Sequence, residues 1–587
     1  MASTEFEPEP TSAWGSDLIA DALTQLAIPF ITLTPGASFR GLHDSLVNHL
    51  GNANPQMVLC LHEEHAVAIA HGYAKVTSQP LAVALHSNVG LMHASMAIFN
   101  AYADRVPMLI IGSDGPADSA KRRPWIDWLH TSADLGALVR NFVKWDDRAL
   151  SAAAAIPSIL RGNQLTRAAP QGPVFIGLDV AAQEERVPIG GAMQTRCAPL
   201  PDPEPARASL AEAAELLNGA SRAVILMGRV SRSSADWQRR VELAEACNAR
   251  VITHHKLGAA FPTAHPLHGG SPSLFLGEEN QELLRGADVI LSLDWLDLGG
   301  TLVKAFDGVP MSPRVISSSL EHQLYNGWNK LDFTLPSVDV HLLCTPDVAV
   351  RSLLPLIDRN DSPDREAAPE PSGNAATPAE GLSDDSGELT VRDLQYALRE
   401  STAADSVTLI RVPFAWNFAD WSLKDPLDYL GGDGGGGIGA GPGMAVGAAL
   451  ALRTTSRLPV AVLGDGDLLM GVAALWTATA QQIPLLIVVA NNASFYNDEI
   501  HQQTVAKLRG RPLSRAHIGM RIAEPAINLA DLARGQGWDG LGPVESAGQL
   551  ESALRSATEI VRGGGRALVD VRVQRGYGAP GHNTTPH

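Results

Sequence analysis

Two short polar segments end consecutive apolar runs in the last third of the chain. Gly464-Asp465-Gly466 closes the first run and Asn491-Asn492 closes the second, so that Asp465 and Asn492 are 27 residues apart. A carboxylate and an amide oxygen are both ligands that Mg²⁺ accepts. The glycines let the backbone approach a phosphate group closely. The pair of segments therefore predicts a site for a metal ion and a phosphorylated ligand.

The sequence between these segments predicts the elements that position them. The runs LPVAVLGDG and PLLIVVANN are typical of buried strands, and DLLMGVAALWTATAQQ between them is typical of a helix. Neighbouring parallel strands bring their carboxyl ends to one edge of a sheet, where α/β proteins hold ligands. Asp465, Asn492 and the backbone carbonyl of Ser494 would then face Mg²⁺, with positions left for two phosphate oxygens. The diphosphate would also face a helix N-terminus.

This pattern resembles the diphosphate-binding signature of the thiamine diphosphate (ThDP) enzymes, which runs from Gly-Asp-Gly to Asn-Asn with about this spacing. Two turns that merely end buried strands would explain the glycines but not the spacing. The resemblance implies ThDP and Mg²⁺ as cofactors. It assigns cofactor contacts to Gly464, Asp465, Gly466, Asp467, Asn492 and Ser494, and metal ligands to Asp465, Asn492 and Ser494.

A second motif, LCLHEEHAVAIAHGYA, lies near the amino terminus. In the 2-oxo acid decarboxylase and acetolactate synthase group of ThDP enzymes, a Glu precedes an alanine-rich helix that ends in Gly-Tyr-Ala. Counting back from that ending selects Glu63. The resemblance implies that its carboxyl hydrogen-bonds the aminopyrimidine of the cofactor and so promotes formation of the ylid. Glu64 is the alternative, and an acid that merely stabilises a helix N-terminus is the non-catalytic possibility.

The glycine-rich run LGGDGGGGIGAGPGMAVGAAL resembles the family segment that bends the cofactor. Ile438, preceded by Gly437, takes the place of the bulky apolar residue that lies between the two cofactor rings. The bend brings the pyrimidine nitrogen near the reactive carbon, which is a proximity effect. Asp433 and the additional glycines depart from the family pattern.

Candidates for contact with the substrate lie in the first third of the chain. LHSNVG resembles the Leu-His-Ser of benzoylformate decarboxylase, which points to His86 as a group that transfers a proton or orients a carboxylate. In PGAS, Ala37 aligns with the serine that meets the substrate in that family, and Ser38 follows it. WLHTSAD resembles the double-histidine segment of pyruvate decarboxylases, with His130 kept and its partner replaced by Leu129. Hydrogen-bonded or surface histidines are the alternative.

One more acid follows the Asn-Asn pair, in NNASFYNDEIHQQ. Pyruvate decarboxylases carry a catalytic Glu six residues after Asn-Asn, and Asp498 takes that place on an expected helix. An acid that caps the helix is the alternative.

Alternating strand-like and helix-like runs predict an α/β fold of three doubly wound domains, each with a parallel sheet. The resemblance names them pyrimidine-binding (13–190), middle (200–357) and diphosphate-binding (389–575) domains. The remaining segments are expected to be a disordered tail (1–12), a linker rich in Pro, Ser and acids (358–388) and a mobile tail (576–587).

Composition narrows the choice of partner and compartment. The 587 residues carry a formal net charge of −18, which argues against nucleic acid and anionic membranes as partners. The sequence has no apolar run of membrane-spanning length and no basic-then-apolar signal at its start. Its four cysteines are scattered without a CxxC pair, which fits reduced thiols. We therefore expect a cytoplasmic protein that acts on a small molecule.

The resemblance implies a lyase that decarboxylates a 2-oxo acid through a carbanion or enamine adduct, in the manner of benzoylformate decarboxylase. A carboligase that transfers the acyl group to a second carbonyl, as acetolactate synthases do, is one alternative. Cleavage of a diketone or an acyl-CoA is another. Flavin-containing relatives carry two arginines in a segment that reads LSLDWLDLGG here (291–300), so FAD is not expected.

The resemblance also bears on assembly. In this family the pyrimidine-binding domain of one subunit meets the diphosphate-binding domain of another, so Glu63 and Asp465 of one site would come from different chains. A homodimer is then the minimal active unit, and a homotetramer forms as a dimer of dimers.

Overall fold

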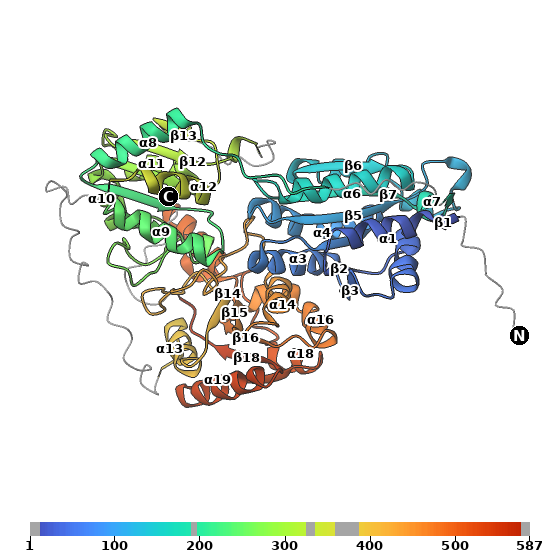
Figure 1. Cartoon of the computed structure of the whole chain (residues 1–587). Coiled ribbons are helices and arrows are strands. Elements are labelled where there is room, and N and C mark those ends of the chain that lie inside the picture. The colour runs from blue at the N-terminus through green and yellow to red at the C-terminus, as the bar shows by residue number, and fades with distance from the viewer. Residues whose placement is uncertain (1–11, 189–196, 324–334, 359–386, 577–587) are drawn as a thin grey trace, which may run out of the picture. The chain divides into compact units, whose positions relative to one another are not determined.

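The computed structural model describes residues 12–188, 197–323, 335–358 and 387–576 (Figure 1). The tail expected at 1–12, the linker at 358–388 and the tail at 576–587 lie almost wholly outside the described residues. Two units make up the chain: Met1–Ala74 with Gln79–Pro201, and Lys75–Ser78 with Asp202–His587. In the described ranges, no helix combines the length and the apolar character that a bilayer crossing requires.

The first unit is built on six parallel strands, of which the four inner ones carry apolar runs that are almost fully buried and the two edge strands are only partly buried. The strands are β2 (Phe30–Leu33), β3 (Gln56–Leu59), β4 (Ala82–His86), β5 (Met108–Asp114), β6 (Trp145–Ala149) and β7 (Pro173–Asp179), in the order β3-β2-β4-β5-β7-β6. The helices are α1 (Gly15–Gln25), α2 (Arg40–Asp44), α3 (Glu63–Thr77), α4 (Ser87–Ala103), α5 (Ile126–Leu129), α6 (Ala152–Arg167) and α7 (Val180–Gln183). A short antiparallel pair joins β1 (Ser12–Trp14) to β8 (Arg186–Pro188). Because β4 lies inside the sheet, its end at His86 opens in the middle of the carboxyl edge.

The second unit contains two further parallel sheets. The first has the order β10-β9-β11-β12-β13, so the chain runs in opposite directions from β9 and the crevice beside β9 and β11 is a topological switch point. Its strands are β9 (Ala223–Met227), β10 (Arg250–Thr253), β11 (Val289–Leu293), β12 (Arg314–Ser318) and β13 (Val340–Leu342). Its helices are α8 (Arg207–Gly219), α9 (Ser234–Ala246), α10 (Glu278–Gly286), α11 (Leu298–Ala305) and α12 (Pro346–Leu353).

The last sheet has the order β14-β15-β16-β18-β17 and is also parallel throughout. The strands are β14 (Val407–Arg411), β15 (Leu458–Gly464), β16 (Leu485–Asn491), β17 (Asp539–Val544) and β18 (Arg566–Arg572). The helices are α13 (Val391–Ser401), α14 (Gly441–Leu452), α15 (Asp465–Gly471), α16 (Ala474–Ala480), α17 (Tyr496–Leu508), α18 (Leu529–Arg534) and α19 (Ala547–Arg562). Gly464 pairs with Ala490 in the ladder, so β15 and β16 end side by side, as the spacing of the two polar segments predicts.

Helices cover both faces of this last sheet (Figure 1). Alternate residues of β15 and β16, such as Val460 and Val488, share a buried cluster with α13 and α19. The intervening residues, such as Ala461, point to the other face, where α14 packs. The three parallel-sheet domains confirm the expected α/β class.

The helix expected over 467–482 differs from the structure, which breaks it into α15 and α16 at Val472 and Ala473. Gly471 lies against the glycine-rich segment: a Cβ there would come within 2.3 Å of the carbonyl oxygen of Gly439. We attribute the break to this close approach, which periodicity cannot reveal because it joins two distant segments.

Candidate active site

Asp465 is a buried carboxylate with an unpartnered oxygen. It begins α15 directly after β15 and is 4 % exposed, and its Oδ2 has no hydrogen-bond partner among the described residues. Burial raises the pKa of Asp465 to about 6, although the backbone amides of Gly466 and Ser494 act in the opposite direction. An unsatisfied buried carboxylate is costly unless a cation is bound to it. This donor suits a hard ion such as Mg²⁺.

The loop after β16 brings the other two expected metal ligands to the same edge. Asn491 is committed elsewhere, because its side-chain amide donates to Oδ1 of Asp570 at 2.7 Å. Oδ1 of Asn492 accepts from the amide of Ser494 at 3.0 Å, and an amide oxygen keeps a second lone pair for another partner. Ala493 between them has φ +53, a conformation that residues with a Cβ rarely adopt and that is frequent at functional sites. The loop geometry therefore fits a metal and diphosphate site.

Asp467 anchors the glycine-rich segment. Its Oδ1 accepts from the amides of Gly439 at 2.6 Å and Gly441 at 3.3 Å. The guanidinium of Arg411, at the end of β14, lies 3.1 Å from a carboxylate oxygen of Asp467 and 3.1 Å from one of Asp433. Arg411 therefore explains Asp433, the residue that departs from the family pattern.

Ile438 remains 40 % exposed beyond this anchor, with Gly437 beside it, so an apolar side chain is presented on a fixed loop. No motif in the sequence points to Arg411, because its role depends on contacts with residues more than 20 positions away.

Glu63 lies in a cluster of histidines in the first unit. It begins α3, is buried, and its Oε2 lies 3.0 Å from Nδ1 of His93 on α4. Glu64 is the less buried of the two neighbouring acids. The histidine partner was not anticipated, because nothing in the spacing of the motif links residue 63 to residue 93.

His86 stands at the end of β4 with its ring held by Ser38. The Ser38 hydroxyl lies 2.8 Å from Nδ1 of His86, and the Ser38 amide donates to the same nitrogen at 3.4 Å. Because an amide can only donate, Nδ1 is the acceptor and the neutral ring carries its hydrogen on Nε2. Burial and then the nearby His130 lower the pKa of His86, which favours this neutral form. Ala37, which aligns with the family serine, is exposed, whereas Ser38 is buried and reaches the histidine.

His130 joins this group from the segment after α5. Its ring meets that of His86 edge to face, with 4.7 Å between centroids. Ser87, at the start of α4, donates its hydroxyl to the carbonyl of His130 at 2.9 Å, and Asn88 donates to the carbonyl of Leu129 at 3.0 Å. Ser87 itself has φ +50. The structure thus brings together His86 and His130, which are 44 positions apart, and places both in the unit that holds Glu63.

Asp498 and the adjacent Glu499 differ in burial and in their contacts. Asp498 lies in the first turn of α17 with its side chain exposed. Glu499 is buried, accepts from the hydroxyl of Ser494 at 3.1 Å and pairs with Arg521 at 2.9 Å. Glu499 therefore supports the loop that carries the expected metal ligands, a role that its position in the sequence did not indicate.

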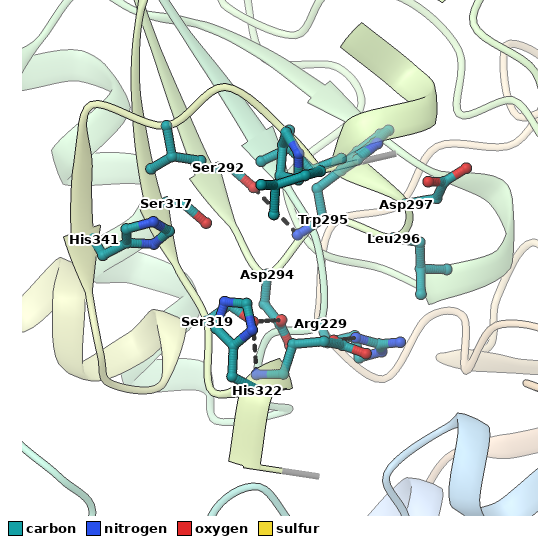
Figure 2. Close-up of a pocket in the computed structure, with 15 residues that line it drawn as sticks. Arg229, Ser292, Asp294, Trp295, Leu296, Asp297, Ser317, Ser319, His322 and His341 are labelled. Atoms are coloured by element: carbon teal, nitrogen blue, oxygen red, sulfur yellow. Dashed lines mark hydrogen bonds and ion pairs between the residues drawn. The ribbon is translucent and has the colours of Figure 1, made fainter. Parts of the chain in front are cut away.

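The segment 291–300 lines a cavity of about 460 Å³ at the carboxyl ends of β9, β11 and β12. Figure 2 shows Arg229 beside Asp294, and the guanidinium lies 3.6 Å from Asp294 and 3.0 Å from Glu321. Asp297 adds another carboxylate to the lining. The arginine in this wall is thus already paired with acids, and the expectation that FAD is not bound stays a prediction.

Three family models match successive parts of the chain. They describe the N-terminal TPP-binding domain of thiamine pyrophosphate enzymes at residues 13–137, their central domain at 210–294 and their C-terminal TPP-binding domain at 413–571. The chain belongs to the thiamine pyrophosphate (ThDP) enzyme family. The recognised family and the expectation of a ThDP-dependent enzyme are thereby confirmed.

Curated relatives span nearly the whole chain of this ThDP enzyme. Benzoylformate decarboxylase of Pseudomonas aeruginosa is 25 % identical, covering 88 % of this chain and 92 % of the relative. The acetolactate synthase isozyme 1 large subunit of Escherichia coli is 23 % identical, covering 98 % and 96 %.

Solved structures share the fold. Benzoylformate decarboxylase from Polynucleobacter necessarius superposes with a TM-score of 0.78 at 20 % identity, covering 96 % of this chain and 99 % of that one. The 4-hydroxybenzoylformate decarboxylase of Rhodococcus jostii gives 0.76 at 21 % identity, covering 96 % and 100 %. At these identities the likeness supports the fold alone.

Replacing either aspartate of α15 by asparagine should change the stability of the metal-free protein, in opposite directions for the two residues. The pKa of Asp465 is raised in the folded state, so the ionised carboxylate lowers the free energy of unfolding. This loss of stability begins above about pH 4 and is complete above about pH 6. Asp465→Asn should therefore stabilise the protein at pH 7 by about 1–3 kcal/mol, and the gain should shrink as the pH falls through 6.

Asp467→Asn is the matched control, because it removes a charge that Arg411 and two amides satisfy. It should destabilise the protein by about 1–3 kcal/mol. Denaturant unfolding of both variants, after removal of metal and cofactor, measures the two changes. Destabilisation by Asp465→Asn at pH 7 would show that the Asp465 carboxylate is satisfied by the fold, contrary to this prediction.

Proposed function

We propose that the protein decarboxylates a 2-oxo acid to the corresponding aldehyde, with ThDP and Mg²⁺ as cofactors. The observation that carries this proposal is the neutral His86, whose Nδ1 is occupied by Ser38 and whose Nε2–H is left free to donate. A positioned proton donor near the reacting carbon favours protonation, and hence release of an aldehyde, over capture by a second carbonyl.

The residues of the second unit would hold the cofactors. Asp465, the side chain of Asn492 and the carbonyl of Ser494 would bind Mg²⁺, and Gly464 and Gly466 leave the backbone accessible to the diphosphate. Asp467 would act by keeping the glycine-rich segment in place, so that Gly437 and Ile438 meet the cofactor rings. When bound, ThDP supplies the electron sink that accepts the electron pair of the breaking carbon–carboxylate bond.

The residues of the first unit would move protons and orient the substrate. The carboxyl of Glu63 would hydrogen-bond the aminopyrimidine, and the Nε2–H of His86 would orient the substrate carboxylate. His86 would later give its Nε2 proton to the product carbon while Nδ1 takes up a proton from water through the Ser38 hydroxyl, so that the ring stays neutral. His130 would fix the ring of His86 by its edge-to-face contact. Asp498, on α17 of the second unit, is a further candidate for a catalytic acid. The likeness to benzoylformate decarboxylase supports an aromatic 2-oxo acid as the substrate, and an acid with a branched side chain is the alternative.

Products distinguish this reaction from its alternatives. The purified protein is incubated with a panel of 2-oxo acids, with and without ThDP and Mg²⁺ and with and without an aldehyde acceptor, and products are followed by NMR. An aldehyde that requires both cofactors supports the proposal. An acyloin formed only with the acceptor would replace it by carboligation, which the likeness to acetolactate synthase favours. No consumption of any 2-oxo acid would refute the proposal and favour diketones or acyl-CoA thioesters as substrates.

Replacing Glu63 tests its role directly. Glu63→Gln keeps the size of the side chain but cannot exchange a proton, so turnover should fall by at least ~100-fold while ThDP still binds. Steady-state kinetics and calorimetric titration with ThDP measure the two effects. Glu64→Gln is the matched control, with turnover close to that of the unchanged protein. Normal turnover in Glu63→Gln would refute the assignment.

Mixing two inactive variants tests the proposed homodimer. If Glu63 and Asp465 of one site belong to different chains, a mixed dimer of Glu63→Gln and Asp465→Ala subunits has one intact site and one doubly altered site. Random reassociation should then restore about a quarter of normal activity. Sites built within one chain would leave every site damaged and restore nothing. Gel filtration of the same samples separates dimers from the proposed tetramer.

A further inference from the structure

Three histidine rings cluster beside Glu63 in the first unit. His93 on α4 bonds Oε2 of Glu63, and the ring of His62 stacks on that of His93 with 5.0 Å between centroids and 18° between planes. The ring of His65 is tilted against that of His62, with 5.3 Å between centroids. One ring nitrogen each of His62 and His93 and one carboxylate oxygen of Glu63 lie within 4.8 Å of one another. Such a group could serve either as a transition-metal site or as a path for protons.

The hydrogen bonding of His62 argues against the metal. Its Nδ1 accepts from the amide of Glu64 at 3.1 Å, so the neutral ring carries its hydrogen on Nε2. A metal ligand needs a free lone pair, and His62 could offer one only by giving up the bond at the start of α3. Glu63 and His93 alone are two ligands, fewer than the three or four protein ligands of zinc sites.

His62 and His65 are neutral at neutral pH, so they contribute packing and not charge to the surroundings of Glu63. Burial lowers the pKa of His62, and burial together with the nearby His62 lowers the pKa of His65 to about 4. Neither ring brings a positive charge to Glu63 at neutral pH. The anchored ring of His62 instead fixes the plane of His93, so that Nδ1 of His93 is directed at the carboxyl.

His93 also connects a buried group with the surface of its unit. Its side chain is 59 % exposed, whereas that of Glu63 is 11 % exposed. Gly90 closes the inner side, since a Cβ there would lie 3.3 Å from Cγ of Glu63. With its Nδ1–H donated to Oε2, the ring has its Nε2 lone pair free for a proton.

We propose that His93 relays protons between the buried carboxyl of Glu63 and water held at the surface of this unit, which in the proposed homodimer faces the partner chain. A proton taken up from water at Nε2 is matched by transfer of the Nδ1 proton to Oε2, which leaves a neutral ring and a protonated carboxyl. The reverse transfer returns that proton to Nδ1 and releases the Nε2 proton to water. The exchange consumes no other reactant, and His93 acts through Glu63 as a positioning residue.

The relay rests on the proposed role of Glu63 toward ThDP, and the test separates the two. Exchange of the thiazolium C2 hydrogen for deuterium is measured on the assembled holoenzyme by rapid acid quench and NMR, which requires no knowledge of the substrate. His93→Asn keeps a donor near the place of Nδ1 but cannot pass a proton through its amide. Its exchange rate should fall by at least ~10-fold while the affinity for ThDP is unchanged.

Rescue and a matched control complete this experiment. Added imidazole should restore exchange in His93→Ala but not in His93→Asn, whose side chain fills the space. His49→Asn is the control, because His49 forms an exposed pair with Asp21 at 2.8 Å in the same unit. It should exchange at the normal rate. A normal rate in His93→Asn would overturn the relay and leave only a hydrogen bond that any donor supplies.

Two measurements on the cofactor-free protein distinguish the relay from a different tautomer and from a metal site. The ¹⁵N shifts of labelled histidine should show the hydrogen of His93 on Nδ1, and a hydrogen on Nε2 would overturn the proposal. Co²⁺ titration of the same protein should give no ligand-field spectrum that depends on both His62 and His93. Such a spectrum would replace the relay by a metal site.

In the holoenzyme, exchange that is equally fast in Glu63→Gln would refute the proposed function itself.

Discussion

Burial of carboxylates at the carboxyl ends of parallel strands is the constraint on which the rest of this structure depends. A parallel sheet is covered on both faces, so only its edges can present polar groups to a ligand. Asp465 and Glu63 both follow strands in this way and are nearly excluded from water. A buried charge requires a partner. The surrounding loops are arranged around the partners that these two acids have or can accept.

Asp465 and Asp467 illustrate the difference within one helix. Asp467 has two amides and Arg411, and it fixes the glycine-rich segment against the sheet. Asp465 has an oxygen without any partner among the described residues, and its pKa is raised by burial. Asp467 therefore has a cationic partner within the fold, whereas Asp465 has none among the described residues. Two acids only two positions apart thus differ in whether the protein itself balances their charge.

The parts of the site that follow from local order could be predicted from the sequence. The strand-helix-strand spacing placed Asp465 and Asn492 at one sheet edge, and the Gly-Tyr-Ala ending selected Glu63, which is buried at the start of α3. Contacts between distant segments were out of reach. His93 beside Glu63, Ser38 beside His86 and Arg411 between Asp433 and Asp467 depend on how separate loops meet. The break between α15 and α16 has the same origin, since Gly471 yields to a carbonyl from another segment.

Ser87 constrains the position of His86 through its backbone and its side chain. The residue turns the chain from β4 into α4 in a left-handed conformation that costs about 1–2 kcal/mol for any residue with a Cβ. Its hydroxyl tethers the carbonyl of His130, so the strain and the tether occur in the same residue. A glycine would relieve the strain and lose the tether. The orientation of His86 therefore depends on the backbone of Ser87 and on the His130 segment together, and a change in either would turn the His86 ring.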